Sequence, residues 1–505
     1  MDSIIIKCLL IILYIINSIN LIYLYQDDHY HNRIFRLILI NDLKRKSYLY
    51  LLIIFLFINR NLLVNIIFIL ILLIYILINF NIKHFKKIKY TNRIMRLLGI
   101  HLLLIISLLI FKTPINGFIF LNILYILINY ILGILSSLLE KLLVKKYYKQ
   151  AKNKINKYKP TIIGITGSCG KTSVKNYLYE CLKEKYITYK SPKSYNTLNG
   201  LSLTVNKYLH CYDNYFILEM GLSHKNDIKN ITKIFKPNIS IITEILPSHL
   251  ETMKSIDNII HEKMQIISNM TNNGLIIING DNELIINNID KYNIHHNKII
   301  KIGFNNLNDY CVDEYLIKKD GLEFIIKDNI NNNSYNINSK LIGRHNIYNI
   351  LIVFSVLSYF NINKDKIISY INNLYNYENR LEIKKYNNMT ILNDSYNSNI
   401  NGFINALEIL SLYQNKKYII TPGIVESGSE SESIIKKIAN KITETCDFCY
   451  LINNKNTKYF INVFNDRKYK NFKIKSNFLE AFNELKNEEI TLLIENDLTD
   501  FYYIK

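Results

Sequence analysis

The sequence is poor in cysteine, and the cysteines it has do not form the pattern of a metal site. Seven are scattered over 505 residues, and the one close pair, Cys446 and Cys449, has no second C-x-x-C motif beside it. Recognisable nucleic-acid-binding modules are also missing from the sequence. We therefore expect neither a structural zinc ion nor a nucleic-acid partner.

Acidic residues are scarce relative to basic ones. The chain has 62 lysine and arginine residues against 41 aspartate and glutamate residues, which gives a formal net charge of +21. Much of the excess in the first third lies in segments that flank long apolar runs. This placement favours anionic lipid headgroups or an anionic substrate as partners.

The first third of the chain, residues 1–145, is dominated by isoleucine and leucine. Its apolar runs approach the roughly 20 residues that cross a bilayer as a helix, and we predict a helical membrane region of about five spans. A four-span version remains open because the second run is short. A cleaved signal peptide is not expected, since no small-residue cleavage site follows the first run. The runs are Ser3–Tyr25, Tyr48–Ile58, Leu62–Phe80, Leu97–Phe111 and Ile115–Leu139.

The distribution of basic residues predicts how these spans are oriented. The segments Arg33–Lys46, Lys83–Arg96 and Lys141–Lys152 are rich in lysine and arginine, whereas the links near Asn59–Asn61 and Lys112–Asn116 carry little charge. By the positive-inside rule the basic segments are cytoplasmic. We therefore expect an integral protein of the plasma membrane, with its N-terminus outside and the rest of the chain after the third basic segment in the cytoplasm, where cysteines stay reduced.

The segment Thr161–Tyr177, TIIGITGSCGKTSVKNY, has the pattern of a phosphate-binding loop. An apolar run typical of a strand leads into a glycine-rich turn, and a helix follows. Glycines let backbone N–H groups face an anion, a lysine reaches the β- and γ-phosphates, and a threonine hydroxyl holds Mg²⁺. The motif predicts nucleotide binding by Gly167, Ser168, Gly170, Lys171, Thr172 and Ser173.

The chain after about Pro160 alternates short β-branched runs with amphipathic helical stretches, as in an α/β domain with a mostly parallel sheet. Asp309–Ile342 instead predicts two or three antiparallel strands that turn at Lys319–Gly321. From Asn379 the alternation restarts, which predicts a second, smaller doubly wound domain of the Rossmann-like type. We place the central domain at residues 155–375 and the C-terminal domain at residues 376–505. The predicted strands include Thr161–Thr166, Tyr215–Glu219, Ile239–Thr243, Leu275–Asn279, Ile299–Ile302, Met389–Asn393, Tyr418–Thr421, Phe448–Leu451 and Ile490–Glu495, and the predicted central helices are Lys171–Lys185, Lys225–Phe235, Ser255–Met270 and Asn346–Tyr359.

Three further polar residues follow the predicted strands in an order that suits a nucleotide site. Glu219 closes the strand YFILE, where a carboxylate would face bound Mg²⁺. His249 follows the next strand in the segment TEILPSH, and Lys263 lies inside the helix after it. Each has an ordinary alternative, as a helix cap, a loop histidine or a solvated lysine. Their order behind a phosphate loop favours the functional interpretation.

Seven segments, in order along the chain, resemble the Mur ligases, and among them the type that adds D-Ala-D-Ala to UDP-N-acetylmuramoyl-tripeptide (MurF-like). The resemblance covers about residues 160 to 412, which makes it far more specific than one motif. It implies a P-loop Mur ligase central domain, a C-terminal domain that closes over ATP, and ATP and Mg²⁺ as cofactors. The segments are GITGSCGKTSVKN, SYNTLNGLSLT, FILEMGLSHKNDI, KPNISIITEILPSHLETMKSIDNIIHEK, LIGRHNIYN, NRLEI and NDSYNSNINGFINAL.

The resemblance also implies roles for individual residues. Lys171 would hold phosphates, and Lys263 matches a lysine that is carbamylated in the family, so that a cation becomes an anion beside the metals. The metal ligands implied are Thr172, Glu219, His249 and Lys263, and the implied catalytic residues are Lys171, Lys263 and His249. The positions that match the adenine side and the nucleotide contacts of the C-terminal domain are His345, Asn346, Asn349, Arg380 and Asp394.

The implied reaction is ATP-dependent amide formation through an acyl phosphate, on a cell-wall precursor of the peptidoglycan type, with an amino acid or dipeptide as the amine. Membrane segments stand where the resembling ligases have their UDP-sugar domain, so the acceptor is either UDP-linked or lipid-linked. Thr421–Gly428 and Leu492–Tyr502 also differ from the matching stretches of that type, which leaves the amine open. Alternatives are another amide ligase or amidating enzyme of the superfamily, and a non-catalytic membrane scaffold that kept the nucleotide fold.

Overall fold

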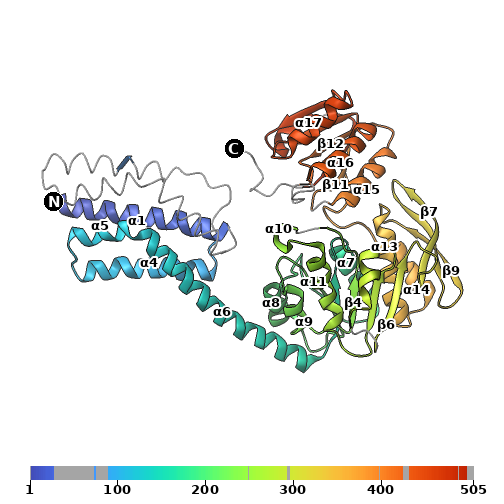
Figure 1. The fold of residues 1–505 in the computed structure, drawn as a ribbon, viewed down its shortest axis with the longest axis horizontal. Coiled ribbons are helices and arrows are strands. Elements are labelled where there is room, and N and C mark those ends of the chain that lie inside the picture. Colours follow the sequence, from blue (N-terminus) through green and yellow to red (C-terminus); the bar gives the residue numbers. More distant parts are fainter. Residues whose placement is uncertain are drawn as a thin grey trace. The chain divides into compact units, whose positions relative to one another are not determined.

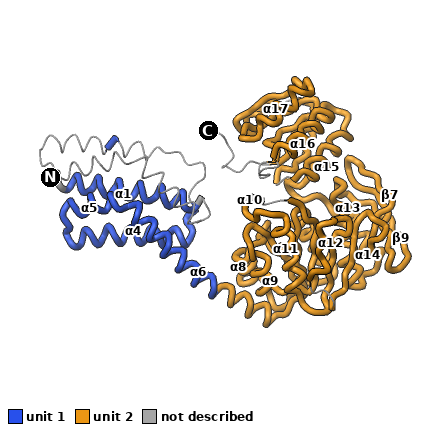
Figure 2. Tube along the Cα trace, in the orientation of Figure 1, with its two compact units in different colours: residues 1–146 blue, residues 147–505 orange. Residues whose placement is uncertain are grey.

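The computed structural model describes residues 2–27, 73–74, 89–247, 250–292, 296–396, 399–424, 431–486 and 488–496 (Figure 1). The chain divides into two compact units, residues 1–146 and residues 147–505 (Figure 2).

The described residues of the first unit are mostly helical. They form α1 (Asp2–Asp27), α4 (Asn92–Ile110), α5 (Ile115–Ile123) and the first part of α6 (Tyr125–Tyr158). In the described part of the chain, α1, α4 and α6 are long and apolar enough to cross a membrane. The predicted runs Tyr48–Ile58 and Leu62–Phe80 lie outside the described residues, except for Leu73 and Ile74.

The predicted run Ile115–Leu139 is not one continuous helix, because the chain leaves the helix at Leu124 and starts α6 at Tyr125. Asn122 lies next to the last residue of α5. Its Nδ2 donates to the carbonyl O of Phe118 in its own helix and to that of Leu10 in α1, each at 3.0 Å, so this end of α5 is bonded to α1.

Helix α6 changes character along its length. Its beginning is apolar, but from Lys141 onward it is rich in lysine, and its end belongs to the second unit. There Ala151 and Ile155 are buried in the same hydrophobic core as Leu201 and Val205 of α8 (Leu198–Tyr208). The last turns of α6 are therefore an integral part of the second unit.

The second unit contains a nine-stranded sheet of order β2-β3-β1-β4-β5-β6-β7-β8-β9. Its strands from β2 to β7 pair in parallel, with β3 and β4 on the two sides of β1. The carboxyl ends of β1, β3 and β4 therefore meet at one edge, as the sequence predicts. The strands are β1 (Thr161–Thr166), β2 (Thr188–Lys190), β3 (Tyr215–Glu219), β4 (Ile239–Ile242), β5 (Leu275–Asn279), β6 (Lys298–Gly303), β7 (Tyr310–Lys318), β8 (Gly321–Asp328) and β9 (Asn333–Ser339).

Alternate residues of the parallel strands bury against two different layers of helices. On β1, for example, Ile163 and Ile165 belong to one core and Ile162 to the other. Burial on both faces explains why these strands read as continuous apolar runs. One layer contains α7 (Lys171–Leu182), α13 (His345–Tyr359) and α14 (Lys364–Asn372), and the other α8, α9 (Asp227–Thr232), α11 (Ile256–Ser268) and α12 (Glu283–Ile289). The short α10 (Leu250–Met253) precedes α11.

The predicted antiparallel extension is confirmed. β7 and β8 pair antiparallel across the turn at Lys319 and Asp320, and β8 and β9 pair in the same way. These three strands continue the sheet beyond β6, away from the strand ends that carry the phosphate-loop motif.

A second sheet of six strands, of order β10-β11-β15-β12-β13-β14, follows in the chain. Only β10 runs antiparallel to its neighbour, and helices cover both faces, as in a doubly wound fold. The strands are β10 (Glu382–Tyr386), β11 (Met389–Asp394), β12 (Lys416–Thr421), β13 (Phe448–Ile452), β14 (Phe472–Lys475) and β15 (Ile490–Glu495). The helices are α15 (Ile400–Ser411), α16 (Ser431–Thr445), α17 (Thr457–Asp466) and α18 (Phe478–Leu485).

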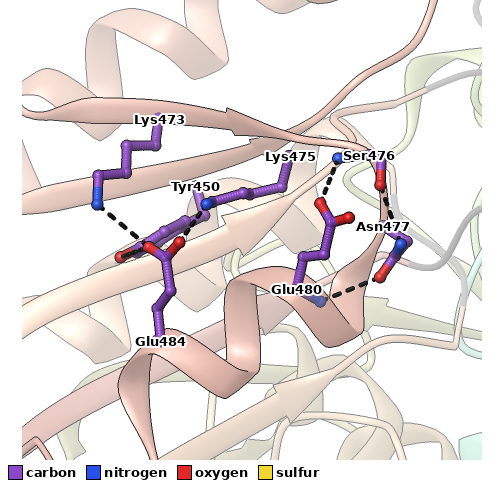
Figure 3. A network of polar contacts seen from close by, with 7 residues as sticks. All are labelled: Tyr450, Lys473, Lys475, Ser476, Asn477, Glu480 and Glu484. Atoms are coloured by element: carbon purple, nitrogen blue, oxygen red, sulfur yellow. Dashed lines mark hydrogen bonds and ion pairs between the residues drawn. The ribbon is translucent and has the colours of Figure 1, made fainter.

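The edge strand β14 is joined to α18 by a surface network (Figure 3). Glu484 of α18 accepts from Tyr450 Oη at 3.1 Å and from Lys473 Nζ at 3.2 Å, and it pairs with Lys475. At the start of the helix, Asn477 caps α18 by accepting from the backbone N–H of Glu480 at 3.0 Å.

Candidate active site

The loop between β1 and α7 has the backbone of a phosphate cradle. Gly167 and Gly170 have φ angles of 153° and 78°, which residues with a side chain rarely adopt. A Cβ on Gly167 would collide with Thr243 Oγ1, and one on Gly170 would lie 2.9 Å from Asn349 Oδ1. The loop therefore depends on glycine at both positions. Ser168 lies between the two glycines, and Ser173 is buried in the first turn of α7.

Lys171 lies over this loop. Its Nζ donates to the carbonyl O of Gly167 at 2.6 Å and to that of Ser168 at 3.4 Å. Burial lowers the pKa of Lys171, and the negative charge of Glu219 opposes that effect. The structure thus places a half-buried cation at the N-terminal end of a helix, where an anion is stabilised.

The segment after β4 holds the loop in place. Thr243 Oγ1 donates to the carbonyl O of Cys169 at 2.5 Å, and the backbone N–H of Ser168 donates to the carbonyl O of Glu244 at 2.7 Å. Cys169 Sγ lies 2.6 Å from Glu244 Oε2, and burial together with this carboxylate raises the pKa of the thiol. Cys169 is therefore a protonated thiol that ties the loop to the segment after β4.

Glu219, at the carboxyl end of β3, faces the start of α7. Thr172 Oγ1 donates to Glu219 Oε2 at 3.1 Å, and Lys175 Nζ lies 2.7 Å from Glu219 Oε1. Glu219 and Lys175 are each only 1% exposed. The phosphate loop and the predicted metal-binding carboxylate are thus brought together.

Lys263 is 2% exposed in the middle of α11. Burial and the positive charge of Lys171 hold its pKa well below that of an ordinary lysine. Its neighbour Glu262 accepts from the backbone N–H groups of Asn226 at 2.8 Å and Ile228 at 2.9 Å, which fixes α11 against the start of α9. Lys263 is therefore a buried amine near the phosphate loop and not the solvated lysine of the ordinary alternative.

The predicted adenine-side residues lie at the start of α13. Asn349 Nδ2 donates to Asn346 Oδ1 at 2.8 Å, and Asn346 Nδ2 donates to the carbonyl O of Ile342 at 2.8 Å. Burial and the nearby charge of Arg380 lower the pKa of His345 to about 4, so the imidazole is neutral at pH 7. Since Asn349 reaches Gly170, this helix borders the phosphate loop.

Arg380 and Asp394 belong to the part of the chain that carries the six-stranded sheet. The guanidinium of Arg380 stacks 4.2 Å from the ring centre of Tyr396, and its charge lowers the pKa of Lys171 and of His345. Burial raises the pKa of Asp394 to about 6, although Arg380 and the backbone N–H of Leu381 oppose this rise. Arg380 is therefore electrostatically coupled to the phosphate loop.

The predicted residue His249 lies outside the described residues. The part of the chain that is described contains no group of three or more acidic, cysteine or histidine side chains that would hold a metal alone. Mg²⁺ does not require one, because it commonly binds one or two protein oxygens together with substrate phosphates and water. Thr172 Oγ1 and Glu219 Oε2 offer two hard oxygens 3.1 Å apart beside the loop, so they fit Mg²⁺ bound with a nucleotide.

Sequence reasoning missed three contributors to this site, namely Lys175, Thr243 and the pair of Cys169 with Glu244. Thr243 and Glu244 belong to the segment TEILPSH, whose predicted role rests on His249 alone. For Lys175 a signal existed, because positions 171, 175, 178 and 182 fall on one face of a helix, and Leu178 and Leu182 mark that face as buried.

A glycine-rich loop between a central parallel strand and a helix, with lysine and threonine opening that helix, defines a nucleotide-binding α/β domain of the P-loop class. Residues 165–357 match the family model described as the Mur ligase middle domain, so this part of the chain is similar to the Mur ligases.

Relatives of known name agree with this family. Over 283 residues the chain is 32% identical to the UDP-N-acetylmuramoyl-tripeptide--D-alanyl-D-alanine ligase of Buchnera aphidicola, an alignment that covers 56% of this chain and 60% of the relative. Over 338 residues it is 29% identical to the ligase of the same name from Rickettsia prowazekii, with 64% of this chain and 72% of the relative covered. The chain thus spans 60% of the length of the Buchnera relative.

Solved structures show the same fold. A MurF ligase from Thermotoga maritima in complex with ADP superposes with a TM-score of 0.61 and 20% identity, covering 70% of this chain and 80% of that one. MurF from Acinetobacter baumannii gives a TM-score of 0.62 and 18% identity, covering 70% and 76%. The predicted Mur ligase α/β fold with a large parallel sheet is confirmed.

Proposed function

We propose that this chain is an ATP-dependent amide ligase of the MurF type, which joins D-alanyl-D-alanine or a related amine to a carboxylate of a peptidoglycan precursor. The observation that carries the proposal is the position of Lys171, Thr172 and Glu219. They meet at the ends of adjacent strands, in a domain whose relatives are ligases that form amide bonds at the expense of ATP.

In the first step an oxygen of the acceptor carboxylate attacks the γ-phosphorus of ATP, the bond to the β-phosphate oxygen breaks, and ADP leaves. Lys171 and the N-terminus of α7 stabilise the charge on the transferring phosphoryl group. Thr172 and Glu219 would hold Mg²⁺, which supplies further charge neutralisation at the phosphates. In the second step the amine nitrogen attacks the acyl carbon, phosphate leaves, and the nitrogen gives its proton to solvent.

Lys263 fits the role of a carbamate. Carbon dioxide reacts with a neutral amine, and a buried lysine with a lowered pKa keeps its neutral form accessible. Carbamylation would replace a buried cation that is repelled by Lys171 with an anion attracted to it. The electrostatics of the pocket therefore support the modification, in addition to the resemblance.

Arg380 and Asp394 would contact the nucleotide from the C-terminal domain. Arg380 is anchored on Tyr396, whose hydroxyl contacts Ser194 Oγ in the loop after β2. A cation that is fixed on an aromatic ring and acts electrostatically on Lys171 is suited to an anionic ligand shared by both domains. Closure of these domains would exclude water from the acyl phosphate.

We also propose that residues 1–145 are an integral membrane region and that the ligase works at the cytoplasmic face. Support comes from the three long apolar helices among the described residues and from the lysines of α6 that follow its apolar part. Retention of the chain in the membrane pellet after alkaline carbonate washing is expected. Release into the supernatant would contradict the proposal.

The acceptor is tested with the purified full-length protein, ATP, Mg²⁺ and D-alanyl-D-alanine, supplied with either a UDP-linked or a lipid-linked muramoyl tripeptide. We expect ADP, phosphate and an amide product whose mass equals that of the two substrates less one water. Absence of product with both acceptors and a panel of amines would reject a ligase of this type. A shortened chain for the same comparison should begin at or before Tyr147, because Ala151 and Ile155 belong to the core of the second unit.

A further inference from the structure

Lys175 and Glu219 form a buried ion pair at the first turns of α7, the helix that follows the phosphate loop. Lys175 lies one helical turn after Lys171, its Nζ is 2.7 Å from Glu219 Oε1, and both side chains are 1% exposed. Removing two charges from water is costly, and a hydrophobic pair of similar volume would often be at least as stable. A buried pair at this position therefore calls for an explanation other than stability.

The two oxygens of Glu219 have different surroundings. Oε1 faces Lys175, whereas Oε2 accepts from Thr172 Oγ1 at 3.1 Å. Only Oε2 is therefore turned toward the hydroxyl that opens α7 and toward the phosphate loop. Lys175 thus holds Oε1 of Glu219, and Oε2 is the oxygen that can bind a metal ion.

Lys175 is itself fixed from a second direction. Its Nζ also donates to the backbone carbonyl O of Lys193, in the loop between β2 and α8. With a carboxylate on one side and a carbonyl on the other, the ammonium cannot swing away from Glu219 without losing a buried partner.

We propose that Lys175 is a positioning residue that makes Glu219 a one-oxygen metal ligand, and that it thereby favours Mg²⁺ over larger cations such as Ca²⁺. This inference rests on the proposed function of the same site. Mg²⁺ requires a compact octahedron of single oxygens, whereas Ca²⁺ takes more ligands and readily accepts both oxygens of one carboxylate. With Oε1 engaged by Lys175, a two-oxygen geometry is closed to Glu219.

The positive charge of Lys175 has a second consequence. It balances the charge of Glu219, so the pair attracts a divalent cation weakly until nucleotide phosphates add their own negative charge. We therefore expect the metal to bind together with the nucleotide and not before it.

The test compares ADP binding to the full-length protein in Mg²⁺ and in Ca²⁺ by calorimetry, for wild type, Lys175→Met and Lys175→Gln. Lys185→Met, a change just beyond the end of α7, is the matched control. For Lys175→Met we expect the ratio of Ca²⁺-supported to Mg²⁺-supported affinity to rise by about tenfold, in line with other residues that orient metal ligands. Lys175→Gln keeps a donor near Oε1, so its ratio should rise less, and Lys185→Met should match wild type.

A second measurement follows Mn²⁺ binding without nucleotide by electron paramagnetic resonance. Wild type should leave Mn²⁺ free, and Lys175→Met should bind it through Glu219, so that adding Glu219→Gln to that variant abolishes the binding. The inference would be overturned if the neutral variants fold and keep the wild-type ratio of Ca²⁺-supported to Mg²⁺-supported ADP affinity. It would also be overturned if neither neutral variant folds, because the pair would then serve stability. Wild type that binds no ADP with either metal would instead reject the proposed function.

Discussion

The two sheets of the second unit each carry a lysine–glutamate pair, and the surroundings of the pairs are opposite. Lys175 and Glu219, at the edge of the nine-stranded sheet, are both 1% exposed. Lys473 and Glu484, beside the six-stranded sheet, are 56% and 35% exposed (Figure 3). An exposed pair costs little and contributes little, whereas a buried pair is expensive to form and to break. The comparison indicates that the buried pair at the phosphate loop, and not the exposed pair, is the one that serves the chemistry.

The same contrast holds for single lysines. Lys171, Lys175 and Lys263 converge at one edge of the nine-stranded sheet, and burial lowers the pKa of each. Because burial disfavours the charged form of a lysine, an anionic ligand at this edge would stabilise the cations of Lys171 and Lys175.

The largest effect is expected at Lys171. Lys171→Ala should reduce ATP-dependent ligation by about 1000-fold or more, because it removes a preorganised cation at the transferring phosphoryl group. Turnover is followed by ADP release, and circular dichroism checks the fold. Lys236→Ala, at an exposed lysine, should retain wild-type turnover. Equal rates for Lys171→Ala and wild type would remove the catalytic role of the loop.

The next largest effect on turnover is expected at Lys263. Lys263→Ala should lose at least about 100-fold in turnover, since it removes a charged group from a water-excluded site. Acetate, or the variant Lys263→Glu, should restore part of the activity if the working form is an anion. Lys263→Arg, which keeps the positive charge and cannot form a carbamate, should stay inactive. An active Lys263→Arg would contradict the assignment.

A smaller effect concerns the pH dependence of stability at His345. Its pKa of about 4 in the folded chain lies below the unfolded value, so the folded state disfavours the protonated ring. The contribution of this group is fully present above about pH 6.5 and is lost as the pH falls toward 4, with a cost of about 3 kcal/mol. His345→Asn should therefore flatten the decline of the thermal midpoint over this range. A decline as steep as that of wild type would locate the pH response elsewhere.

The smallest effect is expected at Glu484. Because the carboxylate is 35% exposed and its partner Lys473 is 56% exposed, Glu484→Gln should leave the thermal midpoint and the turnover unchanged within error. Differential scanning fluorimetry of the full chain checks the midpoint. A clear destabilisation by Glu484→Gln would remove the contrast between the buried and the exposed pair.

The sequence was sufficient where a structural element has a strong periodic pattern. Strands β1, β3, β5 and β15 have the predicted bounds, since strands buried on both faces read as apolar runs between turns. Elements without that pattern were missed. β2 has only three residues, and β14 alternates phenylalanine and isoleucine with lysines as an edge strand does.

The site was predictable to the extent that its motif is local. The phosphate loop and Glu219 could be placed because the carboxyl ends of neighbouring parallel strands must meet. The partners of these residues could not be placed in the same way. Whether Lys175 contacts water or Glu219 depends on the register of α7 against β3, which is set by packing across the core. The bond from Asn122 to Leu10 is similar, because it joins two helices more than 100 residues apart in sequence.

The most direct test of the amide-ligase mechanism is the fate of a carboxylate oxygen. The acceptor is prepared with ¹⁸O in its reacting carboxylate, incubated with the protein, ATP, Mg²⁺ and D-alanyl-D-alanine, and the released phosphate is analysed by mass spectrometry. Because the carboxylate attacks phosphorus and its C–O bond breaks when the amine adds, we expect one ¹⁸O atom in phosphate for each amide formed. Unlabelled phosphate, or release of AMP and pyrophosphate, would contradict an acyl phosphate formed at this site.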